Sequence, residues 1–283
     1  AHINADTPLA DPEQNSCLTE LRGILHELHP ADMAALLESL PPKERVLVWK
    51  LAEPEDDGAV LLEVSEAVRE TLLEAMNREE MLAAVEDMDA DELAELADDL
   101  PHQVVYEALQ TRDEEEREQV KAAMSYEDGT VGALMDFELV SVRADVSCEV
   151  VLRYLRRFDS LPDHTDKIFV VDEQDVLIGV LPIRKLLISN PEELVENVMA
   201  TDVVRFSPED DAEEAAQAFE RYDLVTAPVI DASGKLIGRI TVDEMVDVIR
   251  EESEADILNM AGLQEEEDLF APVWDSVKNR WTW

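Results

Sequence analysis

The sequence predicts an α + α/β fold: an N-terminal superhelix of short α-helices, two tandem α/β modules and a C-terminal amphipathic helix. Three observations predict it: an apolar residue every 12 positions in the N-terminal half, two copies of one segment in the C-terminal half, and an aromatic and basic stripe near the end. We place the superhelix at residues 15–125, the modules at residues 131–195 and 196–253, and the C-terminal helix at residues 254–283.

The N-terminal half repeats a short helical unit. An apolar residue recurs every 12 positions from Leu28 to Leu100, and a capping or turn residue follows it. Pro30, Pro42 and Pro54 stand one position later, where proline suits the first turn of a helix. Because so short a helix cannot bury its own apolar face, we expect the units to stack into a superhelix.

The two α/β modules are copies of one another. Residues 168–181 align with residues 227–240 at an offset of 59, and Leu134-Met135 aligns with Val198-Met199 at an offset of 64. The difference between the offsets, 64 − 59 = 5 residues, places an extra loop around Leu161 to Asp166 of the first copy. Each copy is expected to contain a helix and an apolar hairpin. The expected elements are helices at 150–158, 211–222 and 242–252, and strands at 168–171 and 227–230.

The chain is strongly acidic: 68 Asp and Glu residues against 23 Lys and Arg residues leave a net charge of −45. Because phosphate recognition needs a basic face, this charge argues against a nucleic-acid partner. It suits the binding of cations, and the alternative is the solvated acidic surface of a salt-adapted protein. Hydrophobic residues make up 46% of the chain, so it is not a disordered acidic tail.

The last 30 residues differ from the rest in character. Trp274, Val277 and Trp281 fall on one stripe of a helix, beside Lys278 and Arg280. Aromatic and basic residues together are typical of a membrane edge, and a helix packed on its own domain is the alternative. The abrupt stop at Trp283 leads us to expect that further residues follow it in the full-length protein.

The sequence predicts that the chain is not an enzyme, since it has neither a nucleophile elbow nor a glycine-rich phosphate loop. Carboxylates are the more informative groups. In expected helices, Asp91 and Glu95 are four positions apart and Glu244 and Asp247 three apart. Glu252 and Asp256 are again four apart, within an acidic run. Such pairs repel unless a cation lies between them, and oxygen-only ligands suit Mg²⁺ or Ca²⁺. Chance pairing in so acidic a chain is the alternative for any one of them.

Several motifs make the interpretation more specific. The starts Gly132-Ala-Leu-Met135 and Asn197-Val-Met199, together with the two Leu-Ile-Gly hairpins, resemble a CBS-domain pair. An acidic superhelix, a CBS pair and an amphipathic helix, in that order, resemble the cytosolic region of MgtE magnesium channels. The match rests on Leu28-His-Pro-Ala-Asp32, Asp91-Glu-Leu-Ala-Glu95, Tyr222-Asp-Leu-Val-Thr226 and Gly238-Arg-Ile-Thr-Val-Asp-Glu244 in addition to the CBS starts.

The resemblance implies a homodimer on the cytoplasmic face of the cell membrane, attached to its own membrane domain with a Mg²⁺-selective pore. It also implies regulatory Mg²⁺ ligands at Asp91, Glu95, Asp223, Glu244, Asp247, Glu252 and Asp256. Ala59 and Ala255 stand where family members can have carboxylates, and Glu95 and Glu244 replace aspartates. We therefore interpret the chain as a Mg²⁺-sensing gating region that closes the pore when its carboxylates bind Mg²⁺.

The resemblance also implies ATP as a second ligand, because some members of the family bind ATP. The Thr-x-x-Asp pattern that is usual in nucleotide-binding CBS domains reads Thr241-Val-Asp-Glu244 here. Its counterpart in the first copy, Pro182-Ile-Arg-Lys185, has no acid for a ribose, although Lys185 is suited to a phosphate. The alternative function is accordingly a soluble CBS-pair sensor of adenine nucleotides that regulates a partner enzyme.

Overall fold

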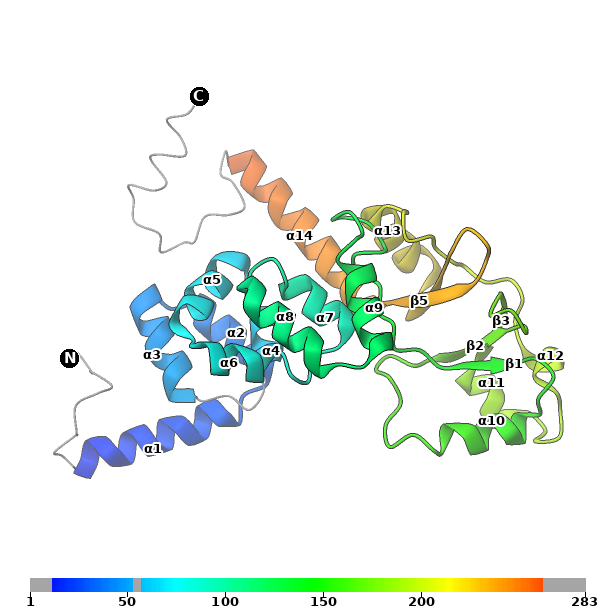
Figure 1. Cartoon of the computed structure of the whole chain (residues 1–283), viewed down its shortest axis with the longest axis horizontal. Coiled ribbons are helices and arrows are strands. Elements are labelled where there is room, and N and C mark those ends of the chain that lie inside the picture. The colour runs from blue at the N-terminus through cyan, green and yellow to red at the C-terminus, as the bar shows by residue number, and fades with distance from the viewer. Residues whose placement is uncertain (1–11, 53–56, 262–283) are drawn as a thin grey trace. The chain divides into compact units, whose positions relative to one another are not determined.

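The structure, a computed structural model, describes residues 12–52 and 57–261, without the side chains of residues 12–18, 251, 252 and 254–261. It divides into two compact units, of which the first holds the helices up to Asp113 and the second runs from Glu114 to Ile257 (Figure 1). The expected fold class, a helical region followed by a mixed α/β region, is confirmed. Each unit is described by itself below.

The first unit is a series of short helices. Their bounds are α1 (Pro12–His26), α2 (Pro30–Glu38), α3 (Pro42–Ala52), α4 (Asp57–Glu63), α5 (Glu66–Ala75), α6 (Arg78–Ala84), α7 (Ala90–Leu96) and α8 (His102–Thr111). Apart from α1 and α4, every helix begins a multiple of 12 residues after Pro30, so the 12-residue periodicity is confirmed. The expected helix start at Pro54 lies outside the described residues. The second unit opens with α9 (Glu114–Ala123), which continues the same spacing.

Alternate helices pack on one another, α2 against α4, α3 against α5 and α6 against α8. Two arginines stand at the fourth position of their helices, Arg45 in α3 and Arg69 in α5. Arg45 is fully buried and donates to the Leu37 and Leu40 carbonyl oxygens at 3.1 and 3.2 Å, at the end of the preceding helix. These carbonyls have no partner within a helix, so the arginine completes the helix end.

The second unit contains the α/β modules. After α9 its elements are β1 (Ser141–Arg143), α10 (Cys148–Leu155), β2 (Lys167–Val171), β3 (Leu177–Pro182), α11 (Ile183–Ile188), α12 (Val195–Val198), α13 (Ala212–Tyr222), β4 (Thr226–Ile230), β5 (Leu236–Thr241) and α14 (Val242–Ala261). In the first module β1 pairs parallel to β2 and β2 antiparallel to β3, and α10 and α11 cover one face of this sheet (Figure 1). In the second module β4 and β5 form the antiparallel hairpin.

The two hairpins are related by an approximate twofold symmetry. The Leu177 N–H donates to the Gly234 carbonyl at 3.0 Å, and the Leu236 N–H donates to the Asp175 carbonyl at 3.0 Å. The two donors, Leu177 and Leu236, are 59 residues apart, and so are the two acceptors, Asp175 and Gly234. This separation equals the offset between the two sequence copies. The repeated segments therefore face each other at the junction of the modules.

Each module completes the core of the other. Val131 and Met135, which precede the first module's strands, pack in the core of the second module with Phe219 and Ile240. Val195 and Val198, at the start of the second copy, pack in the core of the first module. A Cβ on Gly238 would lie 2.4 Å from Met135 Cγ, and one on Gly179 would lie 2.7 Å from the Ala200 carbonyl oxygen. The two glycines that mark the repeat are thus needed for this close approach.

The extra loop of the first copy supports a buried charge in the second copy. Arg239 is buried and pairs with Asp136, with Nε 2.7 Å from the carboxylate. A further guanidinium nitrogen donates to the Asp163 carbonyl oxygen of the loop at 2.7 Å. The corresponding pair of the first copy, Val180 and Ala200, is apolar and needs no such partner.

The last described helix, α14, is longer than expected. It continues from Val242 through the predicted boundary at residue 253 to Ala261. The aromatic and basic segment that follows lies outside the described residues. Among the described helices none combines the length and the apolar character needed to cross a membrane.

Candidate functional site

Asp91 and Glu95 lie on α7, one turn apart on the same helix face. The helix begins where expected because Asp89 and Glu92 form a capping box, in which the Asp89 N–H donates to the Glu92 carboxylate at 2.9 Å. Asp91 is half-buried in the first turn, where a negative charge is favourable, and the Glu95 side chain is 53% exposed. The first unit therefore presents this carboxylate pair on a capped helix.

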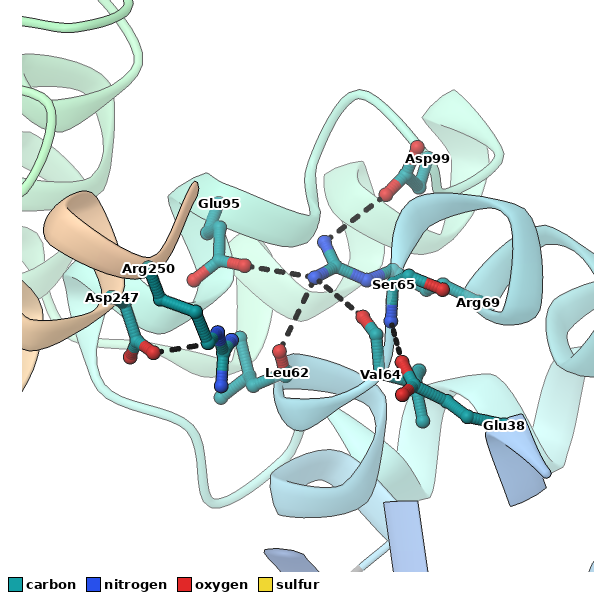
Figure 2. A network of polar contacts seen from close by, with 9 residues as sticks. All are labelled: Glu38, Leu62, Val64, Ser65, Arg69, Glu95, Asp99, Asp247 and Arg250. Carbon is teal, nitrogen blue, oxygen red and sulfur yellow. Dashed lines mark hydrogen bonds and ion pairs between the residues drawn. The ribbon is translucent and has the colours of Figure 1, made fainter. Parts of the chain in front are cut away.

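Glu95 is also held by an arginine that the sequence analysis did not single out. Arg69 of α5 contacts the Glu95 carboxylate at 2.9 Å and the Asp99 carboxylate at 3.2 Å (Figure 2). The same guanidinium donates to the Leu62 and Val64 carbonyl oxygens at the end of α4, at 3.3 and 3.4 Å. The Arg69 side chain is 11% exposed, so a nearly buried cation is shared between two carboxylates and a helix end.

The remaining candidates with described side chains belong to the second unit. Asp223 is exposed and ends α13 in the left-handed region, with φ 50°. Glu244 is half-buried and Asp247 exposed, three positions apart near the start of α14, and Asp247 pairs with Arg250 at 3.1 Å (Figure 2). Glu252 and Asp256 fall within α14, but their side chains lie outside the described residues.

The described residues contain no group of three or more His, Cys, Asp or Glu side chains arranged to hold a metal ion. By helix spacing the candidates with described side chains include two pairs, Asp91 with Glu95 and Glu244 with Asp247. Such pairs fit Mg²⁺ only as partial ligand sets, because Mg²⁺ takes six oxygens and keeps several waters. The donors themselves are oxygen-only, which suits this ion.

The residues considered for a nucleotide are partly engaged. Thr241 is buried at the end of β5, three positions before Glu244. Lys185 Nζ donates to the Val198 carbonyl oxygen at 2.7 Å, so in this structure the lysine supports the chain that joins the modules. In the first module the ammonium group that was expected to suit a phosphate thus already has an internal partner.

The sequence does contain a feature that could have singled out Arg69. Arg69 is a charged residue at a position of the 12-residue repeat that is otherwise mostly apolar. Its position corresponds to Met33, Met81 and Leu93, all buried. Only Arg45, Asp57 and Arg69 carry a charge at this position between residues 33 and 105. A charge there must find partners inside the unit.

Asp57 is the one acid at this repeat position. Burial, and secondarily the nearby Glu80 carboxylate, raise the pKa of Asp57 from 3.8 to about 6. Its Oδ1 atom is buried and has no hydrogen-bond partner among the described residues. The ionised form is therefore costly in the folded protein.

We expect Asp57→Asn to stabilise the first unit at pH 7. Because the folded-state pKa is raised, ionisation destabilises the fold, and this penalty grows from pH 4 to pH 6 and is complete above pH 6. The gain should be about 1–2 kcal/mol after allowance for solvent screening, and should vanish near pH 4. Urea unfolding of both proteins between pH 4 and 8 measures it. Asp98→Asn, at an exposed position, is the control, and a gain independent of pH would contradict the argument.

Comparison with known proteins identifies the architecture. Residues 28–129 match the MgtE intracellular N domain, and residues 131–189 and 195–251 match the CBS domain. The chain is 27% identical over 239 residues to a magnesium transporter MgtE of Bacillus subtilis and 32% identical over 240 residues to that of Thermus thermophilus, in each case over 84% of this chain. It is also 32% identical to the solved cytosolic domain of the Mg²⁺ channel MgtE in complex with ATP, with a TM-score of 0.73, over 83% of this chain and 96% of that one.

This chain belongs to the MgtE family. It spans 53% of the length of the two MgtE transporters, so it corresponds to about half of those proteins. Both are transporters rather than enzymes, which agrees with the prediction that this MgtE chain has no catalytic role. The expected order of MgtE N domain and CBS pair is confirmed.

Proposed function

We propose that this chain is the Mg²⁺-sensing, cytosolic gating region of a magnesium channel or transporter, and that it closes the pore when its carboxylates bind Mg²⁺. The observation that carries the proposal is the shared N domain and CBS pair over almost the whole of a solved MgtE cytosolic domain. The proposed partner is the membrane domain of the same protein, and the proposed location is the cytoplasmic face of the membrane.

The proposed ligands are Asp91 and Glu95 in the first unit, Asp223, Glu244 and Asp247 in the second, and Glu252 and Asp256 in α14. With a net charge of −45, the carboxylates repel one another at low Mg²⁺. Bound Mg²⁺ would neutralise them, and any state that brings more carboxylates to each ion would be favoured. Gating is then a population shift toward the state with the higher Mg²⁺ affinity.

The proposal predicts that millimolar Mg²⁺ compacts this chain. The radius of gyration from small-angle scattering should fall as Mg²⁺ is added, because paired acids in both units lose their repulsion. Na⁺ at matched ionic strength is the control for general screening. A radius that is the same with Mg²⁺ and with matched Na⁺ would reject the gating mechanism.

We propose further that the chain forms a homodimer through its CBS modules. In support, Val150, Tyr154 and Phe158 recur every four positions along and just after α10 with exposures of 39, 39 and 38%. A second apolar helix, α13, contributes less, since Ala215, Ala216 and Phe219 are buried in its own module and Tyr222 is its large exposed hydrophobic residue. The exposed stripe of α10 is therefore the better candidate for the interface.

The dimer is expected to weaken when this stripe becomes polar. Tyr154→Glu places a charge on the apolar face and should raise the dimer dissociation constant by at least about tenfold. Analytical ultracentrifugation with Mg²⁺ at tens of micromolar protein measures it. Tyr106→Glu in α8 changes an exposed tyrosine in the first unit and is the matched control; a monomeric unmodified chain, or equal effects of both variants, would speak against this interface.

ATP binding by the CBS pair is the second candidate function. It is favoured by the solved MgtE cytosolic domain that contains ATP and by the Thr241-to-Glu244 pattern. Calorimetric titration with ATP distinguishes the two functions. Tight ATP binding in a chain that shows no specific Mg²⁺ response would favour a nucleotide sensor that regulates a partner enzyme.

A further inference from the structure

We propose that Arg69 is an internal competitor of Mg²⁺ for Glu95, and that it sets the Mg²⁺ concentration at which the Asp91 and Glu95 pair is occupied. This inference rests on the proposed function, because it takes Glu95 to be a Mg²⁺ ligand. Arg69 is then a positioning residue: it acts on the ion only through the carboxylate that it holds.

The positively charged Arg69 guanidinium already contacts Glu95, which is a proposed Mg²⁺ ligand. Its contact with the Glu95 carboxylate is 2.9 Å long, within the usual range of a charge-assisted hydrogen bond (Figure 2). Arginine stays protonated at every physiological pH, so this competitor is always present. Mg²⁺ must either break the contact or bind a carboxylate whose charge is partly neutralised.

If Mg²⁺ replaces Arg69 at the Glu95 carboxylate, Arg69 keeps its other partners. Its contacts with Asp99 and with the carbonyl oxygens of Leu62 and Val64 do not involve Glu95. The Glu95 side chain is 53% exposed, whereas that of Asp99 is 27% exposed. Glu95, the more exposed carboxylate, is therefore the one that leaves Arg69. Asp99 stays in contact, so the nearly buried charge of Arg69 keeps a counter-charge.

The contact predicts two opposite shifts. Arg69→Gln keeps an amide donor for the carbonyl oxygens but removes the charge. Mg²⁺ should therefore bind at a concentration about two- to fivefold lower, as expected for an ion pair whose carboxylate is exposed. Asp99→Asn removes one of the two carboxylates that contact Arg69 and leaves Glu95 as the other. Arg69 should then hold Glu95 more strongly, so the Mg²⁺ concentration at the midpoint should rise by a similar factor.

Each variant has a matched control that loses the same charge. Arg78→Gln breaks the contact between Arg78 and Glu107 in the same unit, away from the proposed ligands. Asp98→Asn removes an exposed acid one position before Asp99. The midpoint is measured by titrating the full chain with Mg²⁺ at constant ionic strength, followed by scattering and by the NMR signal of the Arg69 Nε–H group. Because Asp99→Asn retains Arg69, it tests the idea even where Arg69→Gln does not fold.

The expected result is a lower midpoint for Arg69→Gln than for Arg78→Gln, a higher one for Asp99→Asn than for Asp98→Asn, and an Arg69 signal that moves during the titration. In the background of Glu95→Gln, Arg69→Gln should have no further effect beyond that of Arg78→Gln. If Glu95→Gln raises the midpoint but the test and control variants coincide, the role of Arg69 is overturned and the proposed function stands. If Glu95→Gln leaves the midpoint unchanged, Glu95 is not a ligand and the role of Arg69 is overturned, whereas the gating proposal is decided by the compaction test.

Discussion

Arg45→Ala is expected to destabilise the first unit by about 3–5 kcal/mol. Arg45 has no exposed surface, and its removal takes the guanidinium donors away from the Leu37 and Leu40 carbonyl oxygens, of which Leu37 keeps the Leu40 N–H. The cavity left by the side chain adds to the cost. Hydrogen exchange of the amides in α2 and α3 measures the effect within this unit.

The control for Arg45 is Arg78→Ala, which removes the same side chain from an exposed ion pair and should cost less than about 1 kcal/mol. The amides of β2 and β4, in the second unit, should keep their protection in both variants, because Arg45 lies in the other unit. Equal losses in the two arginine variants would show that the helix end does not depend on Arg45.

Asp91→Ala combined with Asp247→Ala is expected to raise the Mg²⁺ midpoint of compaction by about tenfold or more. Each substitution removes a proposed direct ligand, and tenfold corresponds to about 1.4 kcal/mol of binding free energy. Asp91 stands on α7 and Asp247 on α14, so the pair removes one proposed ligand from each unit. Scattering across a Mg²⁺ titration at matched ionic strength gives the midpoint.

The matched control for this pair is Glu114→Ala with Glu115→Ala. Both glutamates are exposed in the first turn of α9, and their loss changes the net charge by the same amount. Diffuse screening by exposed charges should move the midpoint only slightly. If both double variants shift the midpoint equally, compaction follows total charge, and Asp91 and Asp247 are not ligands.

Much of the fold could be predicted because it repeats. The 12-residue spacing places the helix starts at Pro30, Pro42, Arg78 and Ala90, and the offset of 59 places the two hairpins. Periodicity reports which side of each element is buried, and that is a local property of the chain. The loop near residue 163 was located for the same reason, as an interruption of a repeat.

The candidate site was predicted less completely. The spacing of Asp91 and Glu95 was sufficient to place both on one helix face, and the assignment of the seven carboxylates as Mg²⁺ ligands stays a prediction. Asp136 and Arg239 pair across 103 residues, and Arg69 reaches Glu95 across 26 residues. No regular spacing in the sequence indicates either pair, because both pairs depend on which elements pack together.

The sequence by itself determined the helical series, the paired modules and the acidic character of this chain, since these follow from local periodicity, repetition and composition. Only the tertiary structure decided that the modules exchange core segments and that Arg69 is shared by Glu95, Asp99 and the end of α4. The physical reason is that a buried charge takes its partners from whatever the packing brings within about 3 Å, and packing is a property of the whole unit.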